Sequence, residues 1–288
     1  MGNEKTKVAG FSVIAAIFLT GFKLAIGLVT GSLGILSEAL HSGLDLVAAV
    51  ITYFSVRVSD VPADKRHNYG HGKVENFSAF IETILLLITC SWIVYEALNR
   101  LISGETNIEV SIWSYIVMSA SIIIDVSRSR ALYRVAKKYN SQALEADALH
   151  FSTDIWSSSV VLMGLVCANF GFFAADSIAA LVVAMIVLVV SYRLGKRAMN
   201  VLLDKAPEES FAKVEEILTN FKEIKRYDDL RIRESGADTF INVRIYLDRD
   251  LSQIQAHLIC DKIEEDIKNV IKRSDVFVHA EPENEIEV

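Results

Sequence analysis

Cysteine and proline are both scarce in this chain, and so is any recognisable hydrolase motif. The three cysteines, Cys90, Cys167 and Cys260, include no CxxC pair. Neither a disulfide framework nor a thiolate zinc site is expected, and we interpret the three as small apolar residues. No HExxH segment occurs, so the signature of zinc metalloproteases is absent. Only three prolines accompany a 52% hydrophobic composition and a mean hydropathy of +0.34, which is too apolar for an ordinary soluble protein.

Long apolar runs dominate the first two thirds of the chain and predict a helical membrane protein. The run at 8–29 is too long for the apolar core of a signal peptide, and more runs follow it. Lys23, near the outer end of this run, is expected to extend to the lipid headgroups. The predicted fold class of this part is an all-α six-helix transmembrane domain, with helices at 8–29, 33–58, 74–102, 110–124 with a basic extension to 138, 141–169 and 175–203.

The charge distribution divides the chain into two predicted domains. Residues 206–288 contain 12 basic and 20 acidic residues, whereas residues 1–205 contain 17 basic and 16 acidic. We therefore expect a near-neutral transmembrane domain at 1–205 and an acidic soluble domain at 206–288. Six spans place both termini on one side, and the basic residues of the connecting segments gather on that side. The positive-inside rule thus predicts a multi-pass protein of the cell (plasma or inner) membrane with cytoplasmic termini.

Two short segments with nearly the same pattern place ionisable residues inside the apolar runs. His41 and Asp45 are four residues apart in the second predicted helix, and His150 and Asp154 repeat this spacing in the fifth. On a helix, the spacing puts both side chains of a pair on one face. Ionisable groups at membrane depth are costly and are usually functional. Two imidazole nitrogens and two carboxylate oxygens match a four-coordinate divalent metal site.

Helix geometry predicts that these four side chains share one depth in the membrane. From the helix rise, His41 and Asp154 lie roughly 10 Å below the outer surface, and Asp45 and His150 roughly 16 Å. The two helices run in opposite directions, as in the inverted repeats that form transport sites. The four groups can therefore bind one ion, provided that the two helices pack together. The alternative is that each pair only hydrogen-bonds to a neighbouring helix.

The polar loop after the second predicted helix contains a second group of possible metal ligands. Asp64, His67 and His71 are spaced to form a three-ligand, partly open metal site. A solvated connector has a similar composition, so this alternative stays open.

The soluble part shows the alternation and periodicity of a small α+β sandwich. Helices are predicted at 208–221 and 254–271, and strands at 230–233, 240–247 and 276–278, which gives the order αββαβ. His257 on the second helix and His279 with Glu281 at the last strand are candidates for a third metal site, although solvated histidines are the alternative. All six histidines of the chain lie in one of these three candidate groups.

With these motifs in place, the chain resembles the cation diffusion facilitator family of zinc and related divalent-metal exporters over essentially its whole length. The matching segments are the two His-x3-Asp pairs, the loop from Asp64 to Lys73, Leu202-Leu203-Asp204, Gln255-Ala256-His257 and His279-Ala280-Glu281. The resemblance implies a homodimer in the lipid bilayer that transports metal by alternating access with coupled proton uptake. It also implies ferredoxin-like cytoplasmic domains that pair and respond to metal, and no nucleic-acid partner is expected.

The resemblance assigns the transport site to the two His-x3-Asp pairs and the loop site to the aspartate and two histidines of the polar loop. The cytoplasmic site departs from the family pattern, because Asp228 and Arg244 stand where many members have histidine. Arginine cannot ligate a metal. The cytoplasmic site is therefore expected to be reduced to Asp228, His257, His279 and Glu281, or to hold fewer ions.

Ligand chemistry favours Zn²⁺ as the transported and regulatory ion. Zinc accepts a tetrahedral shell of two nitrogens and two oxygens, whereas manganese and magnesium favour oxygen-rich octahedral sites. Export of Fe²⁺, Co²⁺, Cd²⁺ or Mn²⁺ by a protein of the same family is the alternative. Because neutral histidine and ionised aspartate bind the metal, protons compete with it, and proton-coupled antiport is expected.

Three functions of other classes fit the pattern less well. An intramembrane metalloenzyme needs an open coordination position and a general base, whereas the quartet supplies a closed shell. A haem protein would use His41 and His150 as axial ligands but would have no use for aspartates one turn away. A metal sensor would use only the soluble domain. The protein is therefore not expected to be an enzyme.

Overall fold

The computed structural model describes residues 2–30, 33–103, 112–169 and 174–283. It consists of two compact units, which are described separately. The first unit comprises Met1–Pro62 and Val74–Met199, and the second comprises Ala63–Lys73 and Asn200–Val288. The polar loop that was predicted to hold a metal site therefore groups with the C-terminal part of the chain rather than with the helices on either side of it.

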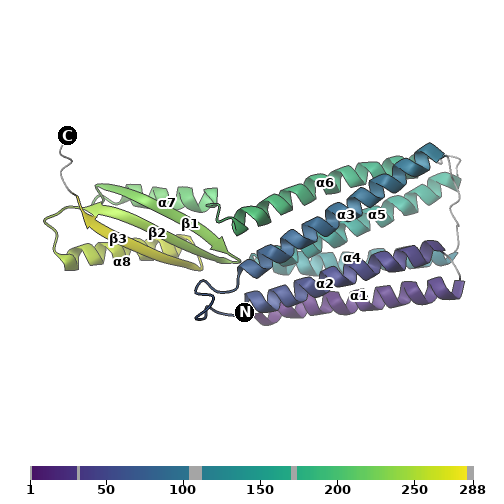
Figure 1. Ribbon diagram of the computed structural model, residues 1–288, viewed down its shortest axis with the longest axis horizontal. Helices are drawn as coiled ribbons and strands as arrows, with labels where there is room; N and C mark the ends of the chain where they lie inside the picture. The colour runs from purple at the N-terminus through teal and green to yellow at the C-terminus, as the bar shows by residue number, and fades with distance from the viewer. Residues whose placement is uncertain (1, 31–32, 104–111, 170–173, 284–288) are drawn as a thin grey trace. The chain divides into compact units, whose positions relative to one another are not determined.

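The first unit is built from long helices (Figure 1). These are α1 (Gly2–Thr30), α2 (Leu33–Ser59), α3 (Lys73–Ser103), α4 (Ile112–Tyr139), α5 (Gln142–Asn169) and α6 (Ala174–Leu202). In the described residues, the segments Glu4–Val29, Ala39–Ser59 and Lys73–Asn99 are long and apolar enough to cross a membrane. For α4, α5 and α6 the spanning role remains a prediction.

Helix α1 begins several residues earlier than its apolar run. Lys138 pairs with Glu4 at 2.6 Å, and the buried Lys5 pairs with Asp60 at 2.6 Å and with Glu75 at 2.7 Å. These ion pairs give the polar first turns tertiary partners, so the helix extends past the apolar residues that predicted it.

Packing in the first unit brings the second and fifth helices together. Helix α2 packs against α5, while α1 contacts α2 and α4, and α4 contacts α5. Their shared core includes Ala9, Val56, Leu132 and Phe151, one from each of these four helices. A shared metal site requires contact between α2 and α5, and this contact is present.

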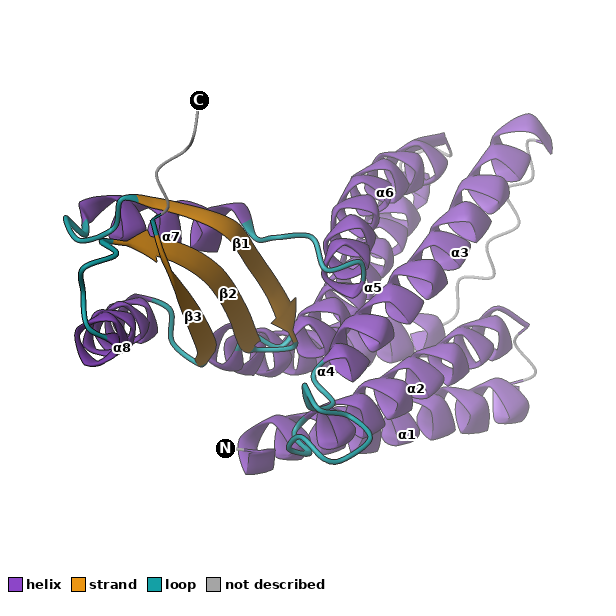
Figure 2. Cartoon of the chain, turned by 60° about the vertical axis from the view of Figure 1, so that its left-hand side comes forward, coloured by secondary structure: helices purple, strands orange, loops and turns teal. Residues whose placement is uncertain are grey.

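The second unit contains a three-stranded sheet with two helices on one face (Figure 2). Its elements are α7 (Glu208–Asn220), β1 (Arg226–Ser235), β2 (Asp238–Leu247), α8 (Gln253–Val270) and β3 (Ser274–Pro282). Strand β2 lies in the middle, antiparallel to β1 and parallel to β3. Alternate residues of β2, such as Ile241 and Ile245, point into a core completed by Leu218 of α7 and Ile263 of α8.

The loop Ala63–Lys73 is held against the β1–β2 hairpin of its own unit. The Tyr69 ring packs edge-on against Phe240 at 5.1 Å between centroids, and the Arg233 guanidinium lies 3.7 Å from the centre of the Tyr69 ring. At Gly72, an added Cβ would lie 2.2 Å from the carbonyl oxygen of Ser235. Only glycine permits this close approach of two backbones, so the end of the loop has a fixed position on the hairpin.

Candidate metal centre

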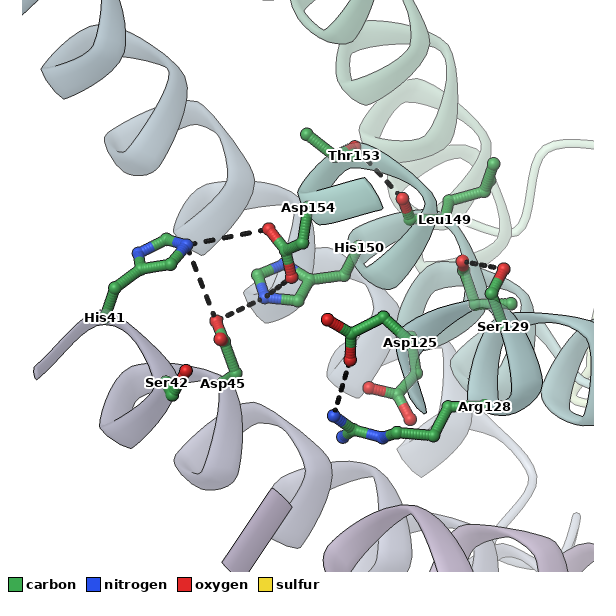
Figure 3. Close-up of polar contacts among 12 residues, drawn as sticks. His41, Ser42, Asp45, Asp125, Arg128, Ser129, Leu149, His150, Thr153 and Asp154 are labelled. Atoms are coloured by element: carbon green, nitrogen blue, oxygen red, sulfur yellow. Dashed lines mark hydrogen bonds and ion pairs between the residues drawn. The ribbon is translucent and has the colours of Figure 1, made fainter. Parts of the chain in front are cut away.

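Four ionisable side chains from α2 and α5 converge at the contact between these helices (Figure 3). His41 and Asp45 come from α2, and His150 and Asp154 come from α5. In each helix the four-residue spacing aligns the imidazole and the carboxylate on the face that meets the partner helix. The sequence-predicted quartet is thus assembled in space.

The separations within the quartet suit a single small dication. His150 Nε2 lies 2.9 Å from Asp45 Oδ1 and 3.7 Å from Asp154 Oδ2. His41 Nε2 lies 3.6 Å from Asp154 Oδ1 and 4.0 Å from Asp45 Oδ1. Tetrahedral zinc, with bonds of about 2.0–2.2 Å, places neighbouring ligand atoms about 3.4 Å apart. Ligand atoms of His41, Asp45 and Asp154 lie within 4.8 Å of one another, and His150 Nε2 reaches both carboxylates, so contraction of the group would bring the four ligand atoms to one ion.

Burial differs among the four ligands. His150 and Asp45 are buried, whereas the His41 side chain is 33% exposed. Nδ1 of His150 has no hydrogen-bond partner among the described residues. Because Nε2 faces both carboxylates, Nε2 is the nitrogen available to a metal.

Several buried polar residues around the quartet were not identified from the sequence. Arg128, predicted only as part of a basic helical extension, is 2% exposed and pairs with Asp125 at 3.1 Å. Its guanidinium also lies 3.5 Å from the centre of the Phe151 ring. Asp147 and Glu82 are fully buried as well. The sequence signal that could have identified Asp147 and Glu82 is the one that identified the histidines: an ionisable residue inside an apolar run.

The expectation that Lys23 extends to the headgroups is wrong. Its side chain is 5% exposed, and Nζ donates a hydrogen bond to Oγ of Ser42 at 2.8 Å. Contact between α1 and α2 covers the face of α1 that carries Lys23, so the ammonium group lies inside the helical unit.

The three loop residues also lie together. His67 Nδ1 is 3.4 Å from Asp64 Oδ1, and His71 Nε2 is 3.8 Å from Asp64 Oδ2. Backbone N–H groups of His67 and Arg66 donate to Asp64 at 2.6 and 2.7 Å and hold the pKa of this carboxyl below its usual range. The carboxylate is thereby kept ionised and oriented toward both imidazoles, as a metal site requires.

Of the residues expected for the cytoplasmic site, Asp228, His279 and Glu281 lie around Arg244, whereas His257 lies apart. The Arg244 Nε atom lies 3.7 Å from Asp228 and 3.5 Å from Glu281, and its Nη2 lies 2.8 Å from Asp229. A guanidinium cation thus lies among the carboxylates that a metal would need. Sequence spacing does not reveal this, because strand pairing places Arg244 opposite Asp228.

Each of the two histidines of that expected site has an acidic partner on its own helix or strand. His257 is 74% exposed at its side chain and lies 3.6 Å from Asp261, one turn along the same helix. His279 lies 3.4 Å from Glu281 on its own strand. Within one protomer, therefore, the structure keeps His257 apart from the other predicted ligands.

Comparison with known proteins identifies the class of protein that this fold and site define. A family model described as the cation efflux transmembrane domain matches residues 10–203, and one described as the cytoplasmic domain of cation efflux proteins matches residues 206–283. The protein is therefore a cation efflux transporter of the membrane and not an enzyme. More particularly, the chain belongs to the cation diffusion facilitator family, and its C-terminal match is to the family's dimerisation domain, which makes the protein a homodimer.

Curated relatives match over nearly the full chain. The cation-efflux pump FieF of Shigella boydii is 30% identical over 289 residues, which cover 98% of this chain and 95% of the relative. FieF of Serratia proteamaculans is 28% identical over 291 residues, with the same shares covered. Among solved structures, the metal-bound C-terminal domain of the CzcD transporter from Thermotoga maritima is 26% identical with a TM-score of 0.26, covering 27% of this chain and 93% of that one.

Proposed function

We propose that the protein exports Zn²⁺ by proton-coupled antiport, with the quartet of His41, Asp45, His150 and Asp154 as its transport site. The observation that carries this proposal is the convergence of the four side chains, with the pair on α2 and the pair on α5 separated by only 2.9 Å at their nearest ligand atoms. Two nitrogens and two oxygens suit zinc, which has no electronic preference among geometries.

Proton coupling follows from the same ligands. Neutral imidazole and ionised carboxylate bind the metal, so protonation of the histidines expels it. A difference of one pH unit across the membrane is worth about 1.4 kcal/mol per proton, enough to support a tenfold difference in metal concentration. Protons that enter from outside would release the ion there, and the metal-free site would then return inward.

The arrangement of the chain in the membrane completes the proposal. We place all six helices across the membrane, with both termini in the cytoplasm and a ferredoxin-like αββαβ domain that begins at residue 206. The Asp64, His67 and His71 group would bind a second, regulatory ion on the cytoplasmic side. Metal binding in the cytoplasmic domain would be weak, because the Arg244 guanidinium already provides the positive charge that a metal ion would bring to Asp228 and Glu281.

Export of a divalent ion other than zinc is the second candidate function. Fe²⁺, Co²⁺ and Cd²⁺ also accept imidazole and carboxylate ligands, and Mn²⁺ is the least favoured because it prefers oxygen-rich sites.

Transport by purified protein in proteoliposomes tests the proposal. Uptake of zinc, iron, cobalt, cadmium and manganese is compared side by side, with a pH-sensitive dye in the lumen and with His150→Ala as the variant that removes a ligand. We expect zinc uptake with proton movement in the opposite direction, and neither in the variant. Zinc uptake without any change in luminal pH would contradict antiport, and uptake retained in His150→Ala would contradict the assignment of the site.

A further inference from the structure

Glu82 is a completely buried carboxyl group that the quartet does not use. It lies within the apolar segment Lys73–Asn99 of α3 and is 0% exposed. Its Oε1 atom accepts hydrogen bonds from the hydroxyl groups of Thr52 on α2 and Ser78 on α3. Its Oε2 atom has no hydrogen-bond partner among the described residues. Because both hydroxyl groups donate to Oε1, Oε2 is the oxygen that can hold a proton.

The balance of buried charges around Glu82 also indicates that this carboxyl group holds a proton. Arg128 pairs with Asp125 and donates to Ser12 at 3.1 Å, and Lys23, which donates to Ser42, is a second buried cation of this region. Asp147, 0% exposed, accepts a hydrogen bond from Ser12 at 3.4 Å through one oxygen, while its other oxygen has no partner in the described chain. The buried carboxyl groups Glu82, Asp125, Asp147 and Asp45 therefore outnumber the buried cations Arg128 and Lys23. Several unpaired charges cannot be kept at membrane depth, so such a cluster retains at least one proton.

The cluster lies beside the transport site, toward the helix ends that contain Ser59, Lys73 and Gln142. Thr52 follows Asp45 by seven residues on α2, a rise of about 10 Å. Asp147 precedes His150 by three residues on α5, which places it one turn away. Asp147 and His150, both from α5, act electrostatically on Glu82. From α6, the contact with this stretch of α3 is made by uncharged residues, Ala198 and Gly195.

We propose that Glu82 is a second proton-binding residue of the transport cycle, separate from the metal ligands. This inference rests on the proposed transport function. Glu82 keeps its proton while the quartet is metal-free. When a dication binds to the quartet, its positive charge favours the ionised carboxylate, and the Glu82 proton leaves toward the ends of α2, α3 and α5 that carry Ser59, Lys73 and Gln142. Each transported ion would then displace a proton from Glu82 in addition to those displaced from the ligands.

Counting protons released on zinc binding tests this assignment in purified full-length protein. Calorimetry with zinc in buffers of different ionisation enthalpy gives both the zinc stoichiometry and the number of protons released. We expect Glu82→Gln, which fixes the neutral form, to bind the same number of zinc ions and to release about one proton fewer per transport site. Glu82→Asp, which restores a titratable acid, should recover that proton.

The comparison separates the possible failures. If Glu82→Gln releases as many protons as the wild-type protein, the assignment of Glu82 is overturned while zinc binding by the quartet stands. If Glu82→Gln loses a zinc equivalent, the carboxyl is a metal ligand rather than a proton site, and the assignment is again overturned. If the wild-type protein and His150→Ala bind zinc equally, the assignment of the quartet as the transport site is wrong.

Infrared spectroscopy provides a measurement that does not depend on the folding of a variant. The band of a protonated, buried carboxyl group should be present in the metal-free wild-type protein and should diminish when zinc is added. The absence of such a band in wild-type protein would overturn the proposal. The band should be missing from Glu82→Gln and unaffected by Ser129→Ala, a buried hydroxyl variant on α4 that serves as the control.

Discussion

Nε2 of His150 lies 2.9 Å from Oδ1 of Asp45, although 105 residues separate the two in the chain. This contact joins one His-x3-Asp pair to the other and turns two local motifs into one four-ligand arrangement. Since each residue belongs to a different helix, relative motion of α2 and α5 would separate the ligands. The affinity of the site for an ion is thereby linked to the conformation of the helical unit.

Replacement of Asp45 by asparagine should abolish high-affinity zinc binding at the quartet. The substitution removes one of two negative charges while preserving shape, so we expect the affinity to fall at least 100-fold, beyond the loss of about 10–100-fold that is typical of residues that only support a ligand. Isothermal titration with zinc measures the change. Thr153→Val is a matched control, because Thr153 is adjacent to Asp154 and its hydroxyl donates to the backbone carbonyl of Leu149.

Replacement of His71 by alanine should remove one zinc equivalent without loss of zinc binding at the quartet. His71 and His67 both face Asp64, and two remaining ligands would hold zinc only weakly. Metal analysis after gel filtration measures the stoichiometry, with Lys65→Ala in the same loop as the control. An unchanged stoichiometry would mean that the loop binds no metal.

The loop site should lose its metal as the pH falls through the range in which imidazoles become charged. The pKa of Asp64 is held below its usual range by backbone N–H groups of His67 and Arg66. Asp64 therefore stays ionised over the range, between about pH 5 and 8, in which protons compete with metals for imidazole ligands in general. Zinc titrations of Asp45→Asn at several pH values isolate the loop site. Retention of the metal until the pH reaches the titration range of Asp64 would contradict this order.

Replacement of Arg244 by alanine should create a zinc response in the C-terminal unit. The change leaves Asp228, Asp229 and Glu281 without the guanidinium that lies among them. We expect zinc to raise the melting temperature of the variant more than that of the wild-type protein, because a dication can replace the lost positive charge. His257→Ala should behave like wild type, and an equal zinc effect in all three proteins would refute this role of Arg244.

Replacement of Lys5 by methionine should destabilise the helical unit. Lys5 is 4% exposed and pairs with Asp60 and Glu75, so its loss leaves two carboxylates without their cation. Removal of one partner from a buried ion pair costs about 3–5 kcal/mol. Chemical unfolding in detergent measures the effect, with the exposed pair partner Lys138→Met as the control. Addition of Glu75→Gln to Lys5→Met should recover part of the loss.

The C-terminal unit shows how far local pattern predicts a fold. Alternation predicted β2 at 240–247, and the strand observed is Asp238–Leu247. Strand β1 was predicted at 230–233 but spans Arg226–Ser235. Its first residues are charged and lack alternation. They extend the strand because they pair with β2, for example Arg226 with Tyr246, whose ring lies 3.5 Å from the guanidinium. Backbone pairing continues where the side-chain pattern gives no signal.

Sequence alone determined the helices, the ligand types and the pairing of His41 with Asp45 and of His150 with Asp154. All of these depend on neighbours within one helical turn and on the cost of placing a charge in an apolar run. Tertiary structure decided which distant groups share an environment. It buried Glu82 beside Thr52 and placed Arg244 among the carboxylates, because side chains far apart in the chain meet only where packing places them.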